Sequence, residues 1–422
     1  IMKRTLPIIT LLLLSVLQVC AQKKNYDFQE GKLYYKVTDA TKLLVEVTTE
    51  LEELLQSTGT LYNKPLEGDI VIPANVKYQG KQYTVAGIAD NSFGGCVKLT
   101  SVAIPASVTT LGEQVFLSCT GLKRITVDKD NPMLKDIDGV LFDKSGNKLI
   151  AYPNMRAANY EIPEGTLELS PVAFFLCNQL ESIKFPSTLK QIGMLSFGHC
   201  VKLHEVTVPN NITDLGYFAF YNCTGLEKAI IKADITELKR YMFSRCTALK
   251  EVTLPSTIEH IGTWTFGSCV SMKNITLPES LKDIEAEAFN GCETLSEITL
   301  PAGLEKIGMY VFDGCKQLKS ITCLRETPLQ GAAMGEGVFE NVNKEECQLK
   351  VPKGHKEEYA AAQQWSDFTN ITEHELTGIN LPTEQDKNVK TTIFTINGQC
   401  LPANAQPTQG IYIINGKKIY VK

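Results

Sequence analysis

The stretch Phe266-Gly-Ser-Cys-Val-Ser-Met-Lys-Asn-Ile-Thr-Leu-Pro278 decides the fold, because its pattern returns every 23 residues. The pattern is F-x-x-C-x-x-L-x-x-I-x-L-P, with Met in place of the first Leu in this copy. A fixed period of this length is typical of a solenoid, in which each coil buries its apolar side only against its neighbours. Phe recurs at positions 93, 116, 174, 197, 220, 243, 266, 289 and 312, and Cys follows three residues after each of them.

Within each unit, the segment I-x-L-P alternates apolar and polar residues, which indicates a short strand that the proline ends. Because each strand recurs after one coil, the strands must lie parallel in one long sheet, and each coil returns through a loop. After the proline, a segment such as Ser256-Thr-Ile-Glu-His-Ile-Gly262 turns the chain back toward the next buried Phe. The pattern therefore predicts a solenoid of 23-residue coils with a parallel β-sheet on one face.

The repeats run from residue 73 to residue 323 and contain one irregular unit. The irregularity lies between Val127 and Tyr160, where the chain is longer than one coil and Asp138-Gly139 is a typical hairpin turn. The register of the repeat is restored after it. We therefore expect a β-hairpin inserted into one coil at about residues 128–158.

The residues on either side of the repeats lack the period, and a solenoid must cover the apolar faces of its terminal coils. Residues 22–72 contain strand-like runs and predict an N-terminal β-rich cap, and residues 324–375 predict a C-terminal cap. A polar linker follows at residues 376–390. Residues 391–422 hold strand-like runs around Asn-Gly turns, so they predict a small C-terminal all-β module.

Composition and the first residues favour an exported, folded protein. Of the 422 residues, 43% are hydrophobic and 21% are charged, which is ordinary for a folded chain. The net charge of −5 becomes −7 without Lys3 and Arg4, so a nucleic-acid partner is not expected. Residues 1–21 have the pattern of a signal peptide, in which these two cations precede an apolar run and cleavage falls before Gln22. No later stretch is apolar enough to span a membrane.

The chain has 13 cysteines, a number that in an exported protein ordinarily suggests disulfides. Nine of them, however, share one position of the repeat, where free Cys serves as a small buried hydrophobe. Paired coils lie about 4.8 Å apart, a spacing that also brings neighbouring Cys near bonding distance. We expect a ladder of buried thiols, and we assign no pairing to Cys323, Cys347 and Cys400.

No pattern in the sequence predicts catalysis, a cofactor or a metal site. The five His residues are scattered and the repeat Cys are interchangeable, so they do not form a nucleophile–base set. Asp128, Asp130, Asp136 and Asp138 lack the ligand spacing of a calcium loop, and roles in turns explain them better. We therefore expect that the protein is not an enzyme and binds neither cofactor nor metal.

Two columns of residues remain outside the repeat pattern and are the candidate binding residues. The first column begins each predicted strand and is polar and varied, as either a recognition face or a solvated face would be. The second lies two residues before the repeat Phe, where large side chains recur about 5 Å apart along the axis. Such side chains either pack between coils or, if exposed, stack on a sugar or anchor a protein partner. The candidates are Glu205, Lys228, Glu251, Asn274 and Glu297 in the first column and Phe218, Tyr241, Trp264 and Tyr310 in the second.

The unit F-x-x-C-x-x-L-x-x-I-x-L-P, with Ile-Gly before the next Phe, resembles the leucine-rich repeats of the BspA-like family over roughly residues 70–372. The segments Ile393-Phe-Thr-Ile-Asn-Gly-Gln399 and Gly410-Ile-Tyr-Ile-Ile-Asn-Gly-Lys-Lys418 are similar to the C-terminal sorting modules of exported Bacteroidota proteins that use type IX secretion. The first resemblance implies a leucine-rich-repeat solenoid, an adhesin-like role and no enzymatic activity. It transfers no binding residue, because family members differ in ligand.

We therefore predict a monomeric, exported leucine-rich-repeat protein, secreted or held at the outer cell surface. Its extended surface would bind an extracellular protein, of the host matrix or a cell surface, or a glycan. The alternative is a structural or glycan-capture component of the cell envelope with no host partner.

Overall fold

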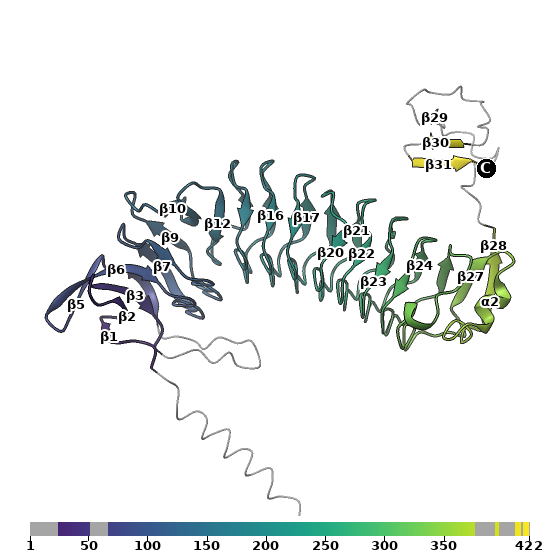
Figure 1. The fold of residues 1–422 in the computed structure, drawn as a ribbon, viewed down its shortest axis with the longest axis horizontal. Helices are drawn as coiled ribbons and strands as arrows, with labels where there is room; N and C mark the ends of the chain where they lie inside the picture. Colours follow the sequence, from purple (N-terminus) through teal and green to yellow (C-terminus); the bar gives the residue numbers. More distant parts are fainter. Residues whose placement is uncertain (1–23, 51–65, 376–392, 396–409, 415–416, 422) are drawn as a thin grey trace, which may run out of the picture.

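The computed structural model describes residues 24–50 and 66–375 with their side chains, and it describes the backbone of three strands within residues 393–421. The predicted signal peptide, the linker at 376–390 and Cys400 lie outside the described residues. Figure 1 shows the coils side by side in a curved row, with a sheet at the N-terminal end and helix α2 (Lys356–Ala361) at the other. The predicted solenoid of 23-residue coils is confirmed.

The predicted parallel sheet runs along what we call the long-strand side of the coils. Among the described residues its strands form four separate parallel ladders and not the single long sheet that we expected. Within a ladder each strand pairs with its equivalent one coil later, as Glu205 does with Lys228 and Lys228 with Glu251. Inward residues such as Val206 and Ala229 are buried, so this side covers the core. Its strands are β4 (Glu67–Val71), β7 (Lys98–Ile104), β9 (Arg124–Val127), β13 (Asn159–Glu161), β15 (Ser182–Lys184), β17 (Glu205–Val208), β19 (Lys228–Ile231), β21 (Glu251–Thr253), β24 (Glu297–Leu300), β26 (Ser320–Cys323), β27 (Gln348–Pro352) and β28 (Asn370–His374).

A second parallel ladder runs along the short-strand side, in the segment before Ile-Gly that we expected only to turn the chain. Gln191–Ile192 pairs with Asp214–Leu215 one coil later. The repeat places the same backbone groups opposite each other on this side too, and pairing satisfies their N–H and C=O groups. The two-residue strands are β8 (Thr110–Leu111), β14 (Glu168–Leu169), β16 (Gln191–Ile192), β18 (Asp214–Leu215), β20 (Glu237–Leu238), β22 (His260–Ile261), β23 (Asp283–Ile284) and β25 (Lys306–Ile307).

The third side, which we call the turn side, consists of turns around the repeat Phe and Cys. These turns are also hydrogen-bonded from coil to coil; for example, the Phe197 N–H donates to Ala219 O at 2.8 Å. Inside them the repeat Phe rings stack along the axis, as Phe220 does on Phe243 with ring centroids 5.4 Å apart. All three sides of a coil are therefore fixed by its neighbours.

The predicted ladder of buried thiols is confirmed at the nine repeat positions, where every cysteine is buried, and Cys323 and Cys347 are buried as well. Seven of the nine repeat thiols donate to the carbonyl of the Phe in the preceding coil at 2.9–3.4 Å, and Cys246 Sγ does so to Phe220 O at 3.1 Å. Burial raises the pKa of the Cys246 thiol well above its ordinary value. This S–H donor explains why the repeat places Cys here instead of a purely apolar residue.

The N-terminal sheet connects directly with the solenoid. Its order is β1-β2-β3-β6-β5, and β6 also pairs in parallel with β8 of the short-strand side. The sheet therefore covers the first coil, as a cap must. Its strands are β1 (Phe28–Glu30), β2 (Leu33–Asp39), β3 (Leu44–Thr48), β5 (Asn75–Tyr78) and β6 (Lys81–Ile88).

The irregular coil contains β10 (Leu134–Ile137), β11 (Val140–Asp143) and β12 (Lys148–Ala151). β10 and β11 pair antiparallel around Asp138-Gly139, and β12 pairs in parallel with β14. Two buried clusters meet at β11, because Val140 belongs to the C-terminal cluster and Leu141 to the N-terminal one. The insertion thus divides the core into two parts.

Helix α2, the 3₁₀ helix η2 (Gly331–Ala333) and strands β27 and β28 close the C-terminal end. Trp365 and Phe368 are buried, and each ring centroid lies 5.1 Å from that of Phe339, so they cover the last Phe of the stack. Beyond residue 375, β29 (Ile393–Thr395), β30 (Gly410–Ile414) and β31 (Lys417–Val421) form an antiparallel sheet.

Candidate functional site

The second predicted column projects from a left-handed backbone position. The residues two before the repeat Phe have positive φ, with values of 58°, 60° and 57° at Phe218, Tyr241 and Trp264. This conformation costs a residue with a Cβ about 1–2 kcal/mol, so Gly and Asn are usual there. Hydrogen bonds to adjacent coils hold this backbone; the Tyr241 N–H donates to Thr263 O at 2.9 Å. Large rings thus occupy positions that backbone energy alone would give to small residues.

Phe218, Tyr241 and Trp264 form a continuous pile of rings along three coils, which we call the aromatic stack. The ring centroids lie 4.6 and 6.2 Å apart, and neighbouring planes are within 5° of parallel. All three side chains are half-buried. Gly267 lies against the indole of Trp264, where a Cβ would overlap the ring. The rings therefore cover one another's faces and leave their edges for contact with a partner.

Tyr310, the fourth member of the predicted column, is separated from the aromatic stack. Glu287 occupies the equivalent position in the intervening coil. Tyr310 lies instead against Gly337, where a Cβ would overlap its ring. The structure thus brings together three of the four predicted rings.

Three rings that the sequence reasoning missed extend the aromatic stack across the turn side. Tyr221 meets Phe218 edge-on at 5.7 Å and His199 at 5.5 Å, and Phe175 meets His199 at 5.3 Å. These residues lie one or two positions after the repeat Phe. Aligning those two columns at the 23-residue period is the signal that would have found them.

Cationic side chains lie over the neighbouring tyrosines. The Arg245 guanidinium is 6.0 Å from the Tyr221 ring centroid, and the Arg240 guanidinium is 5.9 Å from that of Tyr217. Contacts of this kind contribute about 0.5–1 kcal/mol at exposed sites. Burial, and to a lesser extent Arg245, lowers the pKa of His199, which favours the neutral imidazole. Tyr, Trp and Arg are the residue types that contribute most to protein interfaces.

The first predicted column lies on the long-strand side, away from the aromatic stack. The pairing of the strands brings Glu205, Lys228 and Glu251 into register, and the Lys228 ammonium is 3.4 Å from the Glu251 carboxylate. A surface ion pair of this kind contributes at most about 1 kcal/mol. Asn274 and Glu297 are exposed in later coils. The nine predicted residues therefore form two separate columns and not one site.

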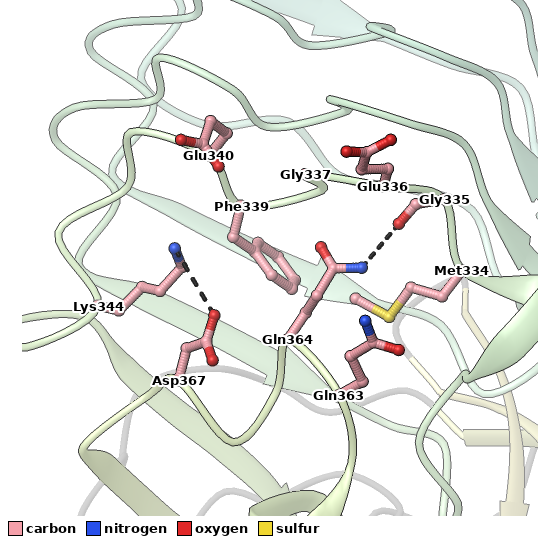
Figure 2. A pocket seen from close by; sticks show the side chains of 10 residues that line it. All are labelled: Met334, Gly335, Glu336, Gly337, Phe339, Glu340, Lys344, Gln363, Gln364 and Asp367. Carbon is pink, nitrogen blue, oxygen red and sulfur yellow. Dashed lines mark hydrogen bonds and ion pairs between the residues drawn. The ribbon is translucent and has the colours of Figure 1, made fainter.

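A hollow of about 350 Å³ lies in the C-terminal cap (Figure 2). The Gln364 amide bridges two backbone groups beside it, because it accepts from the Val338 N–H at 2.9 Å and donates to Gly335 O at 2.7 Å. These bonds replace those that a further coil would make. We therefore assign the hollow to the closing of the solenoid. Its lining is Met334, Gly335, Glu336, Gly337, Phe339, Glu340, Lys344, Gln363, Gln364 and Asp367.

Nothing in the described residues points positively to catalysis. In residues 24–50 and 66–375, His, Cys, Asp and Glu side chains do not gather in threes that could hold a metal ion. Within the same residues, no helix has the length and apolar character needed to cross a membrane. Asp136 serves a turn, since it accepts from the N–H groups of Val127 at 2.8 Å and Gly139 at 3.1 Å. Burial raises the pKa values of the Cys246 and Cys269 thiols, the opposite of what a nucleophile requires.

Comparison with known proteins agrees with this architecture. A family model described as BspA type leucine-rich repeat region matches residues 75–155, 150–269 and 237–356, in six copies. A leucine-rich repeat protein from Eubacterium ventriosum is 23% identical with a TM-score of 0.51, and the match covers 58% of this chain and 76% of that one. At this identity the likeness shows the fold alone.

Two further solved structures are more distant. The pneumococcal vaccine antigen PcpA is 19% identical with a TM-score of 0.48, over 84% of this chain and 100% of its own. A leucine rich cell surface protein from Faecalibacterium prausnitzii is 21% identical with a TM-score of 0.38, over 72% and 96%. The comparison with curated proteins gives no match.

Proposed function

This chain belongs to the BspA-type leucine-rich-repeat family, and from this premise we propose that it is an exported, adhesin-like binding scaffold. Its partner would be an extracellular protein, of the host matrix or of a cell surface, or a glycan. The protein would be secreted or held at the outer cell surface. An extended repeat fold suits this role, because its rigid coils present side chains at a fixed spacing.

The observation that carries the proposal is the aromatic stack. Phe218, Tyr241 and Trp264 are half-buried, and each occupies a strained left-handed position. The same backbone conformation recurs in neighbouring coils, as at Leu195 and Glu287, so it belongs to the scaffold, and what supports the proposal is the choice of three large rings at this position. Rigid aromatic side chains also lose little conformational entropy on binding. This combination favours recognition on the turn side.

Binding of the chain from Gln22 to arrays of purified extracellular-matrix proteins and of glycans tests the proposal. We expect retention on one of these classes, and we expect Tyr241→Ala with Trp264→Ala to abolish it. The matched control is Glu251→Ala with Asn274→Ala, which alters the long-strand side at two consecutive coils. Circular dichroism checks that both double variants fold. Absence of any retained ligand, or equal retention by the aromatic variant, would refute the role of the turn side.

Export and sorting need a separate test. The signal-peptide pattern at residues 1–21 and the likeness of residues 391–422 to type IX sorting modules support passage to the cell exterior. We expect fractionation of producing cells to find the protein at the outer surface or in the medium. A chain that lacks residues 391–422 is expected to remain in the periplasm. Unchanged fractionation of the truncated chain would remove the sorting role but not the binding role.

A further inference from the structure

Charge is divided along the turn side. For each coil we consider the eight residues from three before to four after the repeat Phe. The first five consecutive segments together contain two Arg, both in 240–247, and neither Asp nor Glu. These segments are 171–178, 194–201, 217–224, 240–247 and 263–270. The next three, 286–293, 309–316 and 336–343, contain five carboxylates and one Lys. The aromatic stack lies within the first zone, so rings and cations share one stretch of the surface.

The two cations of this zone, Arg240 and Arg245, are exposed and have no carboxylate partner among the described residues. Many lysines elsewhere in the repeats do pair with the adjacent coil. Lys250, for example, lies 2.9 Å from Glu227. The guanidinium groups instead lie over Tyr221 and Tyr217. Their charge is therefore available to a ligand.

The geometry of the rings distinguishes between a sugar and a protein ligand. A sugar stacks on the open face of an aromatic ring, yet both faces of Tyr241 are covered, by Phe218 at 4.6 Å and by Trp264 at 6.2 Å. The exposed ring edges suit apolar side chains of a protein. The guanidinium fork is matched to a carboxylate, which it binds in a bidentate manner. The surface thus combines contacts for apolar side chains with contacts for acidic ones.

We propose that the aromatic stack, together with Arg240 and Arg245, binds an acidic, extended segment of a protein partner. This inference rests on the proposed function and specifies its ligand. Apolar side chains of the segment contact the ring edges, and its carboxylates pair with the two guanidinium groups. Beyond Trp264 the side chains of Glu287 and Asp313 repel an acidic chain, so they limit the site at its C-terminal end, whereas Glu293 is paired with Lys316 at 2.7 Å.

The test uses the full chain from Gln22 and a synthetic peptide in which glutamate alternates with leucine. We expect salt-sensitive binding, and we expect Arg240→Gln with Arg245→Gln to weaken it by about tenfold or more at low ionic strength. The matched control, Lys273→Gln with Lys319→Gln, removes the same charge from exposed positions outside this surface and is expected to change affinity less than about twofold. The change in tryptophan emission on binding reports Trp264, because the second tryptophan, Trp365, is buried in the cap, away from the aromatic stack.

Two comparison ligands give the outcomes that overturn the inference. One is the same peptide with lysine for glutamate, and the other is polygalacturonate, an acidic polysaccharide. Any one of three results would refute the inference. These are a preference for the lysine peptide, binding of polygalacturonate but not of the glutamate peptide, and equal affinity of the arginine and control variants. If the arrays retain a ligand that the arginine variant still binds, the acidic partner is wrong while the binding role stands. If the arrays retain nothing, the binding role itself fails.

Discussion

Replacing Glu287 with glycine is expected to stabilise the protein, although glycine ordinarily weakens an ordered segment. Glu287 has a φ of 56°, in the left-handed region. Its N–H donates to Met309 O at 2.9 Å, and its carbonyl accepts from the Asn290 N–H at 3.1 Å. A glycine keeps both hydrogen bonds. It also removes the Cβ that makes this conformation unfavourable, and no ring of the aromatic stack is lost.

The magnitude follows from two opposing terms. The left-handed conformation costs a residue with a Cβ about 1–2 kcal/mol. Glycine loses about 0.5–1 kcal/mol more backbone entropy on folding. The middle of these ranges gives a net gain of about 0.75 kcal/mol in the free energy of unfolding, with limits of about 0 and 1.5 kcal/mol. Glu287→Gln removes the charge and keeps the Cβ, so the difference between the two variants isolates the backbone contribution.

Urea unfolding of the parent chain, Glu287→Gly and Glu287→Gln measures this difference. A repeat array can unfold in segments, so circular dichroism should be recorded together with tryptophan emission from both ends of the affected region. We expect the glycine variant to unfold at a higher urea concentration than the glutamine variant. If it unfolds at a lower one, the strain assigned to this position in every coil is wrong.

Three further predictions concern the core, a buried carboxylate and the cap. Cys246→Ala removes the sulfur and its hydrogen bond to Phe220 O, and we expect urea titration to show a loss of about 1–2 kcal/mol in the free energy of unfolding. The control is Thr253→Ala at an exposed position, which should leave the urea midpoint unchanged. An unchanged midpoint for Cys246→Ala would contradict the prediction. Burial raises the pKa of Asp283, whose Oδ1 lacks a hydrogen-bond partner. The folded state therefore favours the protonated acid, so stability should increase as the pH falls from 7 through this raised pKa. Asp283→Asn should raise the melting temperature at pH 7 and flatten its pH dependence. Identical pH profiles of the melting temperature for the parent and the variant would refute this. Gln364→Ala leaves the Val338 N–H without its acceptor, so we expect a loss of about 1–3 kcal/mol in the free energy of unfolding and faster amide exchange at residues 331–352. The control is Gln363→Ala. Equal amide exchange in the two variants would contradict the prediction.

The sequence was sufficient to predict the solenoid because one period controls its whole core. The repeat Phe and Cys recur at a fixed spacing, so each must meet its equivalent in the next coil. That argument also predicted the buried thiols, and the structure adds their acceptor, the Phe carbonyl of the preceding coil. The period alone did not reveal that carbonyl. Which backbone oxygen accepts from the Cys side chain depends on how far one coil is displaced from the next.

The short-strand side shows where the sequence signal was too weak. Its strands have only two residues, so they carry no visible alternation of apolar and polar side chains. The left-handed positions were hidden for a similar reason. Gly337 and Asn91 are typical of such a backbone, but Tyr241 and Trp264 are not, and they gave no indication of positive φ.

The candidate site could be predicted only in part. Phe218, Tyr241 and Trp264 share one column, and their contact follows from the period. Tyr221 and His199 lie in different columns, and their contact with the aromatic stack depends on side-chain directions within the turn. Arg245 over Tyr221 is likewise a contact between neighbouring columns and coils, so a search of single columns misses it.

At the left-handed positions, the stability of the backbone and the choice of side chain have different causes. Their backbone strain is similar for every residue with a Cβ, so stability alone would favour Gly or Asn in all coils. In the aromatic stack, each ring pair offsets part of this strain by about 0.5–1.5 kcal/mol. Glu287, two residues before its repeat Phe, and Arg245, two residues after its own, also have positive φ, of 56° and 62°, and neither is part of a ring pair. Arg245 lies in the coil of Tyr241 and Glu287 lies two coils later, so the sign of the charge changes across the coil of Trp264, where the proposed acidic segment would end. The hydrogen bonds between coils impose the left-handed backbone in every coil, so packing within the solenoid accounts for the strain, and the proposed acidic partner would account for the change of sign.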